Sequence, residues 1–144
     1  MKNKKNFLIL SIVLLFSVLA VFASGNKENI DIVEDNLVAQ YNKVRAEDAK
    51  NIFDTQKDIT IIDVRTEEEF ASGHIENAIN IPLNILKREI LNKYPDKSEK
   101  LYLYCRSGNR SSQGARVLVE EGYYNIYDFG GIIDWPYEIV KWII

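Results

Sequence analysis

Residues 101–112 read Leu-Tyr-Leu-Tyr-Cys-Arg-Ser-Gly-Asn-Arg-Ser-Ser, an apolar run followed by the chain's only cysteine and a short polar loop. The apolar run is aliphatic and aromatic without alternation, which is typical of a strand buried on both faces of a parallel sheet. After the loop, Ser111 or Ser112 can act as the N-cap of a helix that ends near Gly122. The stretch therefore predicts a strand, a loop and a helix, with Cys105 at the end of the strand.

Short apolar runs alternate with helical patterns along much of the chain, which is typical of an α/β fold. Further strands are expected at residues 41–44, 59–64, 78–81 and 126–129. Further helices are expected at residues 46–55, 66–73 and 83–94, with short helices between 132 and 142. We therefore predict an α/β domain with a central parallel sheet and helices on both faces, and with Cys105 at the edge where such sheets bind ligands.

Cys105 is expected to be a nucleophile. The N-terminus of a helix carries partial positive charge, and Arg106 and Arg110 add two cations close to the thiol in sequence. Positive surroundings favour the ionised form of a thiol, which is its reactive form. We therefore predict that Cys105 is a thiolate at neutral pH and needs no general base.

Three charged residues at or after the predicted strand 59–64 are supporting candidates for the site. Asp63 either organises the neighbouring backbone and an arginine or touches the reaction directly. Arg65 likewise either pairs with an acid or binds an anionic substrate. Glu69 has capping-box spacing from Thr66, which predicts that a helix begins there.

His74 is the only histidine of the chain. His74 has two interpretations: a structural role in a turn beside Gly73, or a role in acid–base or metal chemistry. One histidine cannot make a metal site, and an ionised thiol needs no base. We favour the structural role and expect neither a metal nor another cofactor.

The N-terminus has the pattern of a targeting segment. Three lysines precede an apolar run at residues 7–23, which ends where a signal peptidase can cleave. We predict a secretory signal peptide at residues 1–23, with an uncleaved membrane anchor as the alternative because the run is short for a span. A polar, acidic linker at residues 24–40 and one domain at residues 41–144 are expected to follow.

Charge and cysteine content limit the partners. The 144 residues carry a formal net charge of −3, and cleavage after residue 23 would remove three lysines and leave −6. This balance argues against nucleic acid and anionic membranes, so membrane contact is expected only through an uncleaved N-terminal segment. Export to the periplasm or the extracellular face of the cell envelope would place Cys105 in an oxidising compartment, where an unpaired thiol is more often reactive than structural.

Five segments carry a family resemblance. The loop Cys105-Arg106-Ser107-Gly108-Asn109-Arg110-Ser111 resembles the active-site loop of the rhodanese family of sulfurtransferases. Four others resemble the family in the same order, namely Ile62-Asp63-Val64-Arg65 with Glu69-Phe70, Gly73-His74-Ile75 followed by Ala78 to Pro82, Gly122-Tyr123, and Gly130-Gly131-Ile132 with Trp135. The resemblance covers nearly all of the chain from about Tyr41 onward and implies a single rhodanese-like domain.

The resemblance implies a sulfurtransferase that works without a cofactor. Cys105 would take the outer sulfur of thiosulfate or a similar donor, carry it as a persulfide, and pass it to cyanide or to an acceptor thiol, including one on a protein. The N–H groups of residues 106–110 would form a cradle for the anionic sulfur, and Arg106 would meet the anionic donor.

The roles of the other loop side chains stay open at this point. Arg110 either contacts the substrate or holds the loop by pairing with Glu69 or Asp63. Ser107 and Ser111 either add hydroxyl donors or are present because a tight loop suits small polar residues. Gly108 and Asn109 complete the loop.

Two rival functions also place a cationic loop around a thiol. A cysteine-dependent phosphatase or arsenate reductase has five residues between cysteine and arginine, whereas four separate Cys105 from Arg110 and Ser111 stands where that arginine is needed. A non-catalytic rhodanese-like module that binds partners or senses redox state is the alternative from another class. An intact thiol with two arginines favours chemistry over that alternative.

The chain departs from the family pattern at two positions. Asn77 stands where the family usually has glycine, and Pro136 directly follows Trp135. Asparagine tolerates a left-handed backbone, so we expect the turn at Asn77 to survive. Pro136 is expected to alter the end of the domain and the rim of its pocket.

Overall fold

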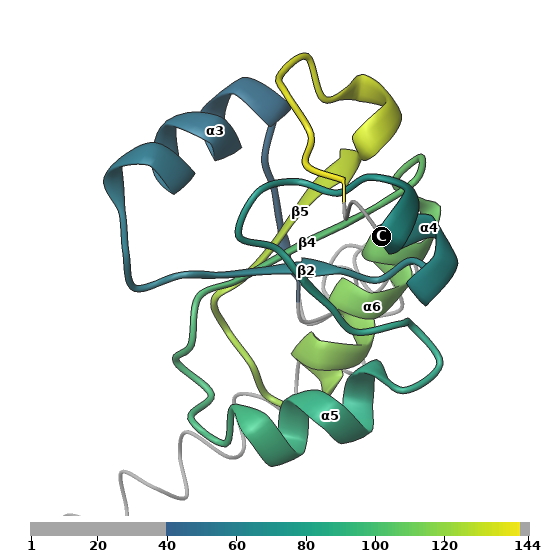
Figure 1. Ribbon diagram of the computed structural model, residues 1–144. Helices are drawn as coiled ribbons and strands as arrows, with labels where there is room; N and C mark the ends of the chain where they lie inside the picture. The colour runs from purple at the N-terminus through teal and green to yellow at the C-terminus, as the bar shows by residue number, and fades with distance from the viewer. Residues whose placement is uncertain (1–39, 142–144) are drawn as a thin grey trace, which may run out of the picture. The chain divides into compact units, whose positions relative to one another are not determined.

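A parallel sheet of five strands lies at the centre of residues 40–141, the part of the chain that the computed structural model describes (Figure 1). The predicted targeting segment and nearly all of the predicted linker lie outside these residues. The strands are β1 (Asn42–Lys43), β2 (Thr60–Asp63), β3 (Ile79–Asn80), β4 (Leu101–Cys105) and β5 (Ile126–Gly131). They lie in the order β1-β5-β4-β2-β3, and every neighbouring pair is parallel.

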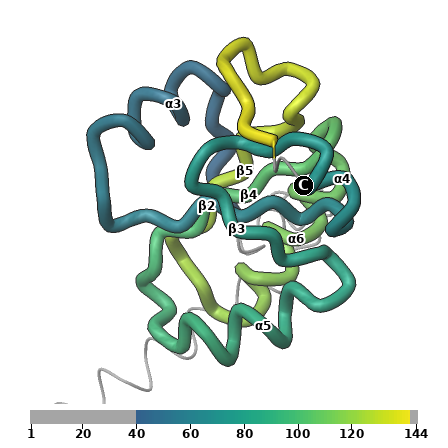
Figure 2. Tube along the Cα trace, viewed as in Figure 1, coloured from purple at the N-terminus to yellow at the C-terminus, as the bar shows by residue number. Residues whose placement is uncertain are grey.

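Helices cover both faces of this sheet, as predicted. They are α3 (Ala46–Thr55), α4 (Glu67–Ser72), α5 (Leu86–Lys93) and α6 (Asn109–Glu120), followed by the 3-10 turn η2 (Ile132–Asp134). Figure 1 shows α3 and the segment after β5 on one side of the strands and α5 and α6 on the other. The trace in Figure 2 shows the short β3 beside β2, where it forms one edge of the sheet. The α/β prediction is therefore confirmed.

The residues of β4 alternate between two hydrophobic clusters. Leu101, Leu103 and Cys105 belong to the cluster that includes α5 and α6 residues. Tyr102 and Tyr104 belong to the cluster with α3 and the segment after β5. All five residues are at least 97% buried, so the prediction of a strand covered on both faces holds.

The predicted start of α6 is wrong by three or four residues. The helix begins at Asn109 rather than after Ser111 or Ser112, and its N-cap is Gly108. Gly108 has a φ of 91°, a left-handed conformation that glycine adopts without steric cost. The glycine therefore turns the loop directly into the helix, and no serine is needed as the cap.

Two other boundaries differ from the predictions. Helix α5 begins at Leu86 instead of residue 83, because residues 82–85 form a turn in which Ile85 N–H donates to the Pro82 carbonyl over 3.0 Å. Between residues 132 and 141 the only helix is η2, where several short helices were predicted. Trp135 nonetheless packs on the sheet residue Phe129, with ring centroids 5.8 Å apart, as expected of the aromatic residues there.

Three local predictions are confirmed. Thr66 and Glu69 form the capping box of α4. Asn77 has a φ of 63°, the left-handed conformation expected where the family usually has glycine. Gly122 follows the C-cap residue of α6, Glu121.

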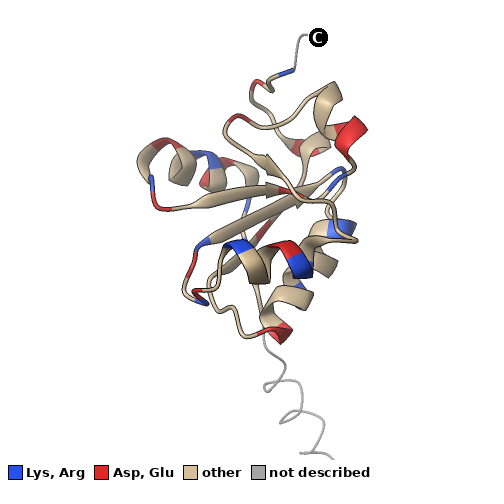
Figure 3. Cartoon of the chain, turned by 60° about the horizontal axis from the view of Figure 1, so that its bottom comes forward, with Lys and Arg blue, Asp and Glu red and all other residues tan. Residues whose placement is uncertain are grey.

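The described surface mixes charges of both signs. Figure 3 shows basic and acidic residues side by side on the helices. Within residues 40–141, no helix combines the length and the apolar character that crossing a membrane requires.

Candidate active site

Cys105 is the last residue of β4 and lies at the floor of the loop that follows it. Its Sγ accepts a hydrogen bond from the Gly108 N–H at 3.1 Å, so one of the amides predicted to hold the sulfur is in contact with it. The residue is only 1% exposed, and its side chain also packs in the cluster of α5 and α6. The thiol is therefore almost completely enclosed, in contrast to the position at an open crevice that the sequence predicts.

The loop backbone rests on the end of β5. Ile133 N–H donates to the Arg106 carbonyl over 3.3 Å. Gly131 lies so close that a Cβ there would be 2.4 Å from the Arg106 carbonyl oxygen and 2.6 Å from Ser107 Cα. The pair Gly130-Gly131 was noted in the sequence only as part of the family resemblance, so its contact with the backbone of the loop was not predicted.

Ser111 serves the backbone of the site. It is fully buried, and its one hydroxyl proton is shared between the Gly108 carbonyl oxygen, 3.1 Å from Oγ, and the Gly130 carbonyl oxygen, 3.3 Å from Oγ. Asn109 Oδ1 accepts a hydrogen bond from Gln113 on the next turn of α6. Ser107 is exposed. Ser111 was predicted either to add a hydroxyl donor to the site or to fit a tight loop. Its contacts with backbone carbonyls match the second, structural role.

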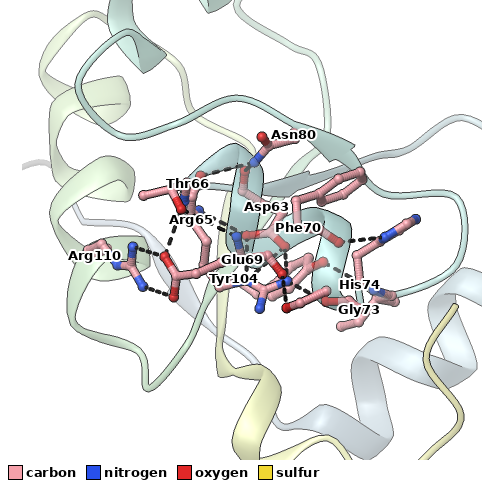
Figure 4. Close-up of polar contacts among 12 residues, drawn as sticks. Asp63, Arg65, Thr66, Glu69, Phe70, Gly73, His74, Asn80, Tyr104 and Arg110 are labelled. Atoms are coloured by element: carbon pink, nitrogen blue, oxygen red, sulfur yellow. Dashed lines mark hydrogen bonds and ion pairs between the residues drawn. The ribbon is translucent and has the colours of Figure 1, made fainter. Parts of the chain in front are cut away.

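Arg110 joins the loop to α4. Its two Nη atoms donate to the two carboxylate oxygens of Glu69 over 2.6 and 2.8 Å, the bidentate pair that Figure 4 draws. Thr66 N–H also donates to Glu69 Oε2 over 3.2 Å. The Arg110 guanidinium is the main cause that lowers the pKa of Glu69 to about 2. Of the two acids predicted as partners for Arg110, Glu69 is therefore the one in contact.

The Glu69–Arg110 pair makes stability depend on pH. Because the folded-state pKa of Glu69 lies below its ordinary 4.5, the pair stabilises the fold above pH 4.5 and loses this effect as the pH falls toward 2. We expect Glu69→Gln, which keeps an acceptor for Thr66 N–H, to cost about 1 kcal/mol at neutral pH for a pair that is 30% exposed. Urea denaturation from neutral to acidic pH should show the gap to wild type shrinking below pH 4.5. The exposed Glu120→Gln is the control, and a gap independent of pH would contradict the assignment.

Asp63 and Arg65 form a buried pair at the end of β2. They are 0% and 5% exposed, and Arg65 Nη2 lies 2.6 Å from Asp63 Oδ2 (Figure 4). Arg65 Nη2 also donates to the Gly73 carbonyl over 2.7 Å, and Arg65 N–H donates to Asp63 Oδ1 over 2.9 Å. These contacts match the first alternative for both residues, a carboxylate that organises backbone and an arginine.

Asn80 was missed by the sequence reading. Its Nδ2 donates to the carbonyls of Asp63 and Arg65 over 2.9 and 3.0 Å and so ties β3 to the chain that leads from β2 into α4. An amide at a strand end carries no distinctive sequence signal, and only the paired register of β2 and β3 brings it there.

Arg106 differs from the other arginines of the site. It is exposed, and within residues 40–141 no carboxylate lies within ion-pair distance of it. Arg65 and Arg110 both hold carboxylates of the protein. Arg106 is therefore the loop cation whose charge is available to an anion from solution.

His74 has backbone partners. Its Nδ1 lies 3.0 Å from the Phe70 carbonyl oxygen, and its own N–H and carbonyl pair with Val140. The imidazole stacks on the Phe70 ring with centroids 3.8 Å apart. These contacts match the structural role favoured for His74. Among the described residues, no group of three or more His, Cys, Asp or Glu is placed to hold a metal ion.

A cavity of about 480 Å³ lies apart from Cys105. Its walls include Phe53, Ile75 and Trp135, which belong to the cluster on the opposite face of the sheet from the thiol. Asn77 and Pro136 also line it, so the two departures from the family pattern lie at this cavity. None of the predicted site residues lines it.

Comparisons with known proteins point to one family. The family model of the rhodanese-like domain matches residues 45–136. The thiosulfate sulfurtransferase PspE of Escherichia coli K12 is 40% identical over 73 residues, which cover 51% of this chain and 70% of that protein. A sulfurtransferase of Allochromatium vinosum is 32% identical over 95 residues, 65% of this chain and 87% of that protein.

A solved structure agrees with these relatives. It is described as a rhodanese with anions from E. coli, and it superposes with a TM-score of 0.53 at 38% identity. The superposition covers 57% of this chain and 96% of the other.

Proposed function

The chain belongs to the rhodanese-like domain family, and we propose that it transfers sulfane sulfur from thiosulfate or a similar donor to cyanide or a thiol through a persulfide on Cys105. Its relatives in E. coli and A. vinosum are sulfurtransferases, which supports this general activity. The observation that carries the proposal is the Gly108 amide that donates to Sγ of Cys105, at the point where β4 ends and α6 is about to begin.

The reaction divides into two displacements on sulfur. The Cys105 thiolate attacks the outer sulfur of thiosulfate, a new S–S bond forms, and sulfite leaves with the electron pair of the bond that breaks. Cyanide or an acceptor thiolate then attacks the outer sulfur of the persulfide. Thiocyanate or an acceptor persulfide forms, and the Cys105 thiolate returns with the electron pair. No oxidant or reductant is consumed.

The loop supplies the charge stabilisation for both steps. The Gly108 N–H already points at Sγ, and the N-terminus of α6 begins at the next residue. Amides and the positive end of a helix stabilise an anionic sulfur without reorganising during the reaction. Arg106, exposed and without a partner acid among the described residues, is assigned to the anionic end of the donor.

The burial of Cys105 restricts the donor. A thiol that is 1% exposed reacts only with a group that enters the loop. The terminal sulfur of thiosulfate projects from a sulfonate, so it can reach the thiol while the charged oxygens stay near Arg106. The proposal therefore favours donors with a projecting sulfane sulfur over bulky ones.

Trapping the persulfide tests the proposal. Incubation with thiosulfate and removal of the excess should add the mass of one sulfur atom to the intact protein, and cyanide should then remove it with release of thiocyanate. The added mass should map to the peptide that contains Cys105. Absence of the added mass in a folded protein, at donor concentrations that load a known rhodanese, would reject the proposal.

The burial of Cys105 also favours the second candidate, a non-catalytic module. A thiol buried in a core cluster is often inert. The two candidates differ in the trapping experiment, because a binding module with an inert thiol stays at its original mass. A cysteine-dependent phosphatase or arsenate reductase is the less favoured alternative, because four residues rather than five separate Cys105 from Arg110 and the Arg110 guanidinium holds Glu69.

Residues 1–23 bear on where the reaction takes place. We propose that they direct export to the periplasm or the outer face of the cell envelope, on the sequence pattern of lysines followed by an apolar run. N-terminal sequencing of the mature protein should find a start at Ser24. A mature protein that begins at Met1 would indicate a retained anchor instead.

A further inference from the structure

The pairing of β4 with β5 shifts register beside the sulfur loop, and we call the extra residue on β5 the bulge. Leu103 of β4 is paired with Asp128 of β5, and Cys105 of β4 is paired with Gly131 of β5. The pairing therefore advances two residues along β4 but three residues along β5. The extra residue lies on β5, where Gly130 has a φ of 90°. Bulges of this kind redirect a strand and are frequent next to active sites.

A buried carboxylate holds the bulge. Asp128 is 2% exposed, and its Oδ1 accepts the Gly130 N–H at 3.0 Å, a side-chain bond to the backbone two residues on. The cation near it is Lys43, whose Nζ lies 3.9 Å from Oδ2 and whose side chain is 74% exposed. Burying a carboxylate is costly unless hydrogen bonds compensate, and the Gly130 N–H supplies one such bond to Asp128.

The bulge in turn sets the position of the loop. The Gly130 carbonyl accepts the Ser111 hydroxyl at the start of α6. Gly131 fits against the backbone of Arg106, close enough that no Cβ has room. A displaced bulge would therefore shift both ends of the loop around Cys105.

We propose that Asp128 is a positioning residue for Cys105, acting through the bulge at Gly130. The carboxylate does not touch the thiol. It fixes the backbone on which the loop rests, so its hydrogen-bond acceptor is what matters rather than its charge. The expected effect of Asp128 on sulfur transfer rests on the proposed function. The expected effect of Asp128 on the reactivity of the Cys105 thiol does not.

Two variants and a control test this assignment. Asp128→Ala removes the acceptor, whereas Asp128→Asn keeps an oxygen that can accept the Gly130 N–H. The exposed Asp134→Asn, on η2, removes a charge near the same loop and is the matched control. The readout is the rate of alkylation of the single thiol by iodoacetamide, which requires no sulfur transfer, together with kcat and KM for thiosulfate.

We expect Asp128→Ala to alter the reactivity of Cys105 and to lose sulfur transfer, and Asp128→Asn to keep both close to wild type. Asp128→Ala should alkylate at a rate at least about tenfold different from wild type and lose about tenfold or more in kcat/KM, since misplacement by about 1 Å is enough for such losses. Asp128→Asn and Asp134→Asn should stay within about threefold of wild type. If the alkylation rates change as expected but neither the wild type nor any variant transfers sulfur, the proposed function fails and the positioning role stands.

Two outcomes would overturn the positioning role. One is a folded Asp128→Ala protein whose thiol reacts like wild type. The other is an Asp128→Asn protein that loses as much reactivity as the alanine variant, since charge and not the acceptor would then be needed. If Asp128→Ala does not fold, the asparagine variant decides alone: reactivity near that of wild type supports the role, and a loss of tenfold or more overturns it.

Discussion

Replacing Cys105 with serine is expected to abolish sulfur transfer. A hydroxyl at this position is a far weaker nucleophile than a thiolate and forms no persulfide, so turnover with thiosulfate and cyanide should fall by at least about a thousandfold. The loss should appear in kcat, and the sulfur adduct should disappear from the intact mass. The measurement is thiocyanate formation under saturating thiosulfate and cyanide.

The same variant should keep its fold. Serine is slightly smaller than cysteine, and its Oγ can accept the Gly108 N–H that Sγ accepts at 3.1 Å. The position is 1% exposed, so the added polarity should cost about 1 kcal/mol or less while that bond is kept. Ser98→Ala, before the start of β4, is the control for handling and stability. Substantial turnover in a folded Cys105→Ser protein would rule out the persulfide route.

Local sequence patterns predicted most of the elements. The unalternating run before Cys105 became a strand buried on both faces, and the spacing of Thr66 and Glu69 became a capping box. Both features depend on residues within one strand or one turn. Periodicity and capping act over that range, which explains why they were readable from the sequence alone.

Features that depend on distant backbone were not predicted. The start of α6 depends on the left-handed Gly108. A Cβ built on Gly108 would lie 3.5 Å from the Cα of Gly130 on β5, which is distant in sequence. The bulge depends on the register between β4 and β5. The choice of Glu69 over Asp63 as the partner of Arg110 spans 41 residues, and the competing Asp63 is already held by Arg65.

The enclosure of the thiol is a further consequence of tertiary structure. The sequence placed Cys105 at the edge of the sheet where ligands bind, but the alternation along β4 directs its side chain toward the cluster of α5 and α6. The loop then closes over it through Gly108 and rests on the end of β5. Reactivity at this position depends on the exact placement of the loop, which makes the support under the loop the most sensitive place for a substitution.

Gly131→Ala is therefore expected to reduce sulfur transfer by about a hundredfold. Gly131 has a φ of −115°, which alanine adopts freely, so the backbone conformation itself is not strained. The new Cβ would lie 2.4 Å from the Arg106 carbonyl oxygen and 2.9 Å from its carbonyl carbon, both rigid backbone atoms. The loop has to move away from β5, and a displacement of about 1 Å is enough to cost about two orders of magnitude in rate. Thiosulfate:cyanide turnover is the measurement.

Loss of stability alone could mimic this result, and Gly122→Ala separates the two causes. Gly122 has a φ of 91°, and apart from Gly122 itself and its two chain neighbours no residue has an atom within 4 Å of the position that an alanine methyl group would take. Alanine there therefore costs about 1–2 kcal/mol of backbone strain without contacting the loop. The steric clash of the new methyl group at position 131 should cost about 1–3 kcal/mol of folding stability, which is similar to the cost at Gly122. If both variants are equally destabilised, only Gly131→Ala should lose turnover in the folded protein at low temperature. Wild-type turnover in Gly131→Ala would mean that the loop does not depend on β5 for its catalytic position.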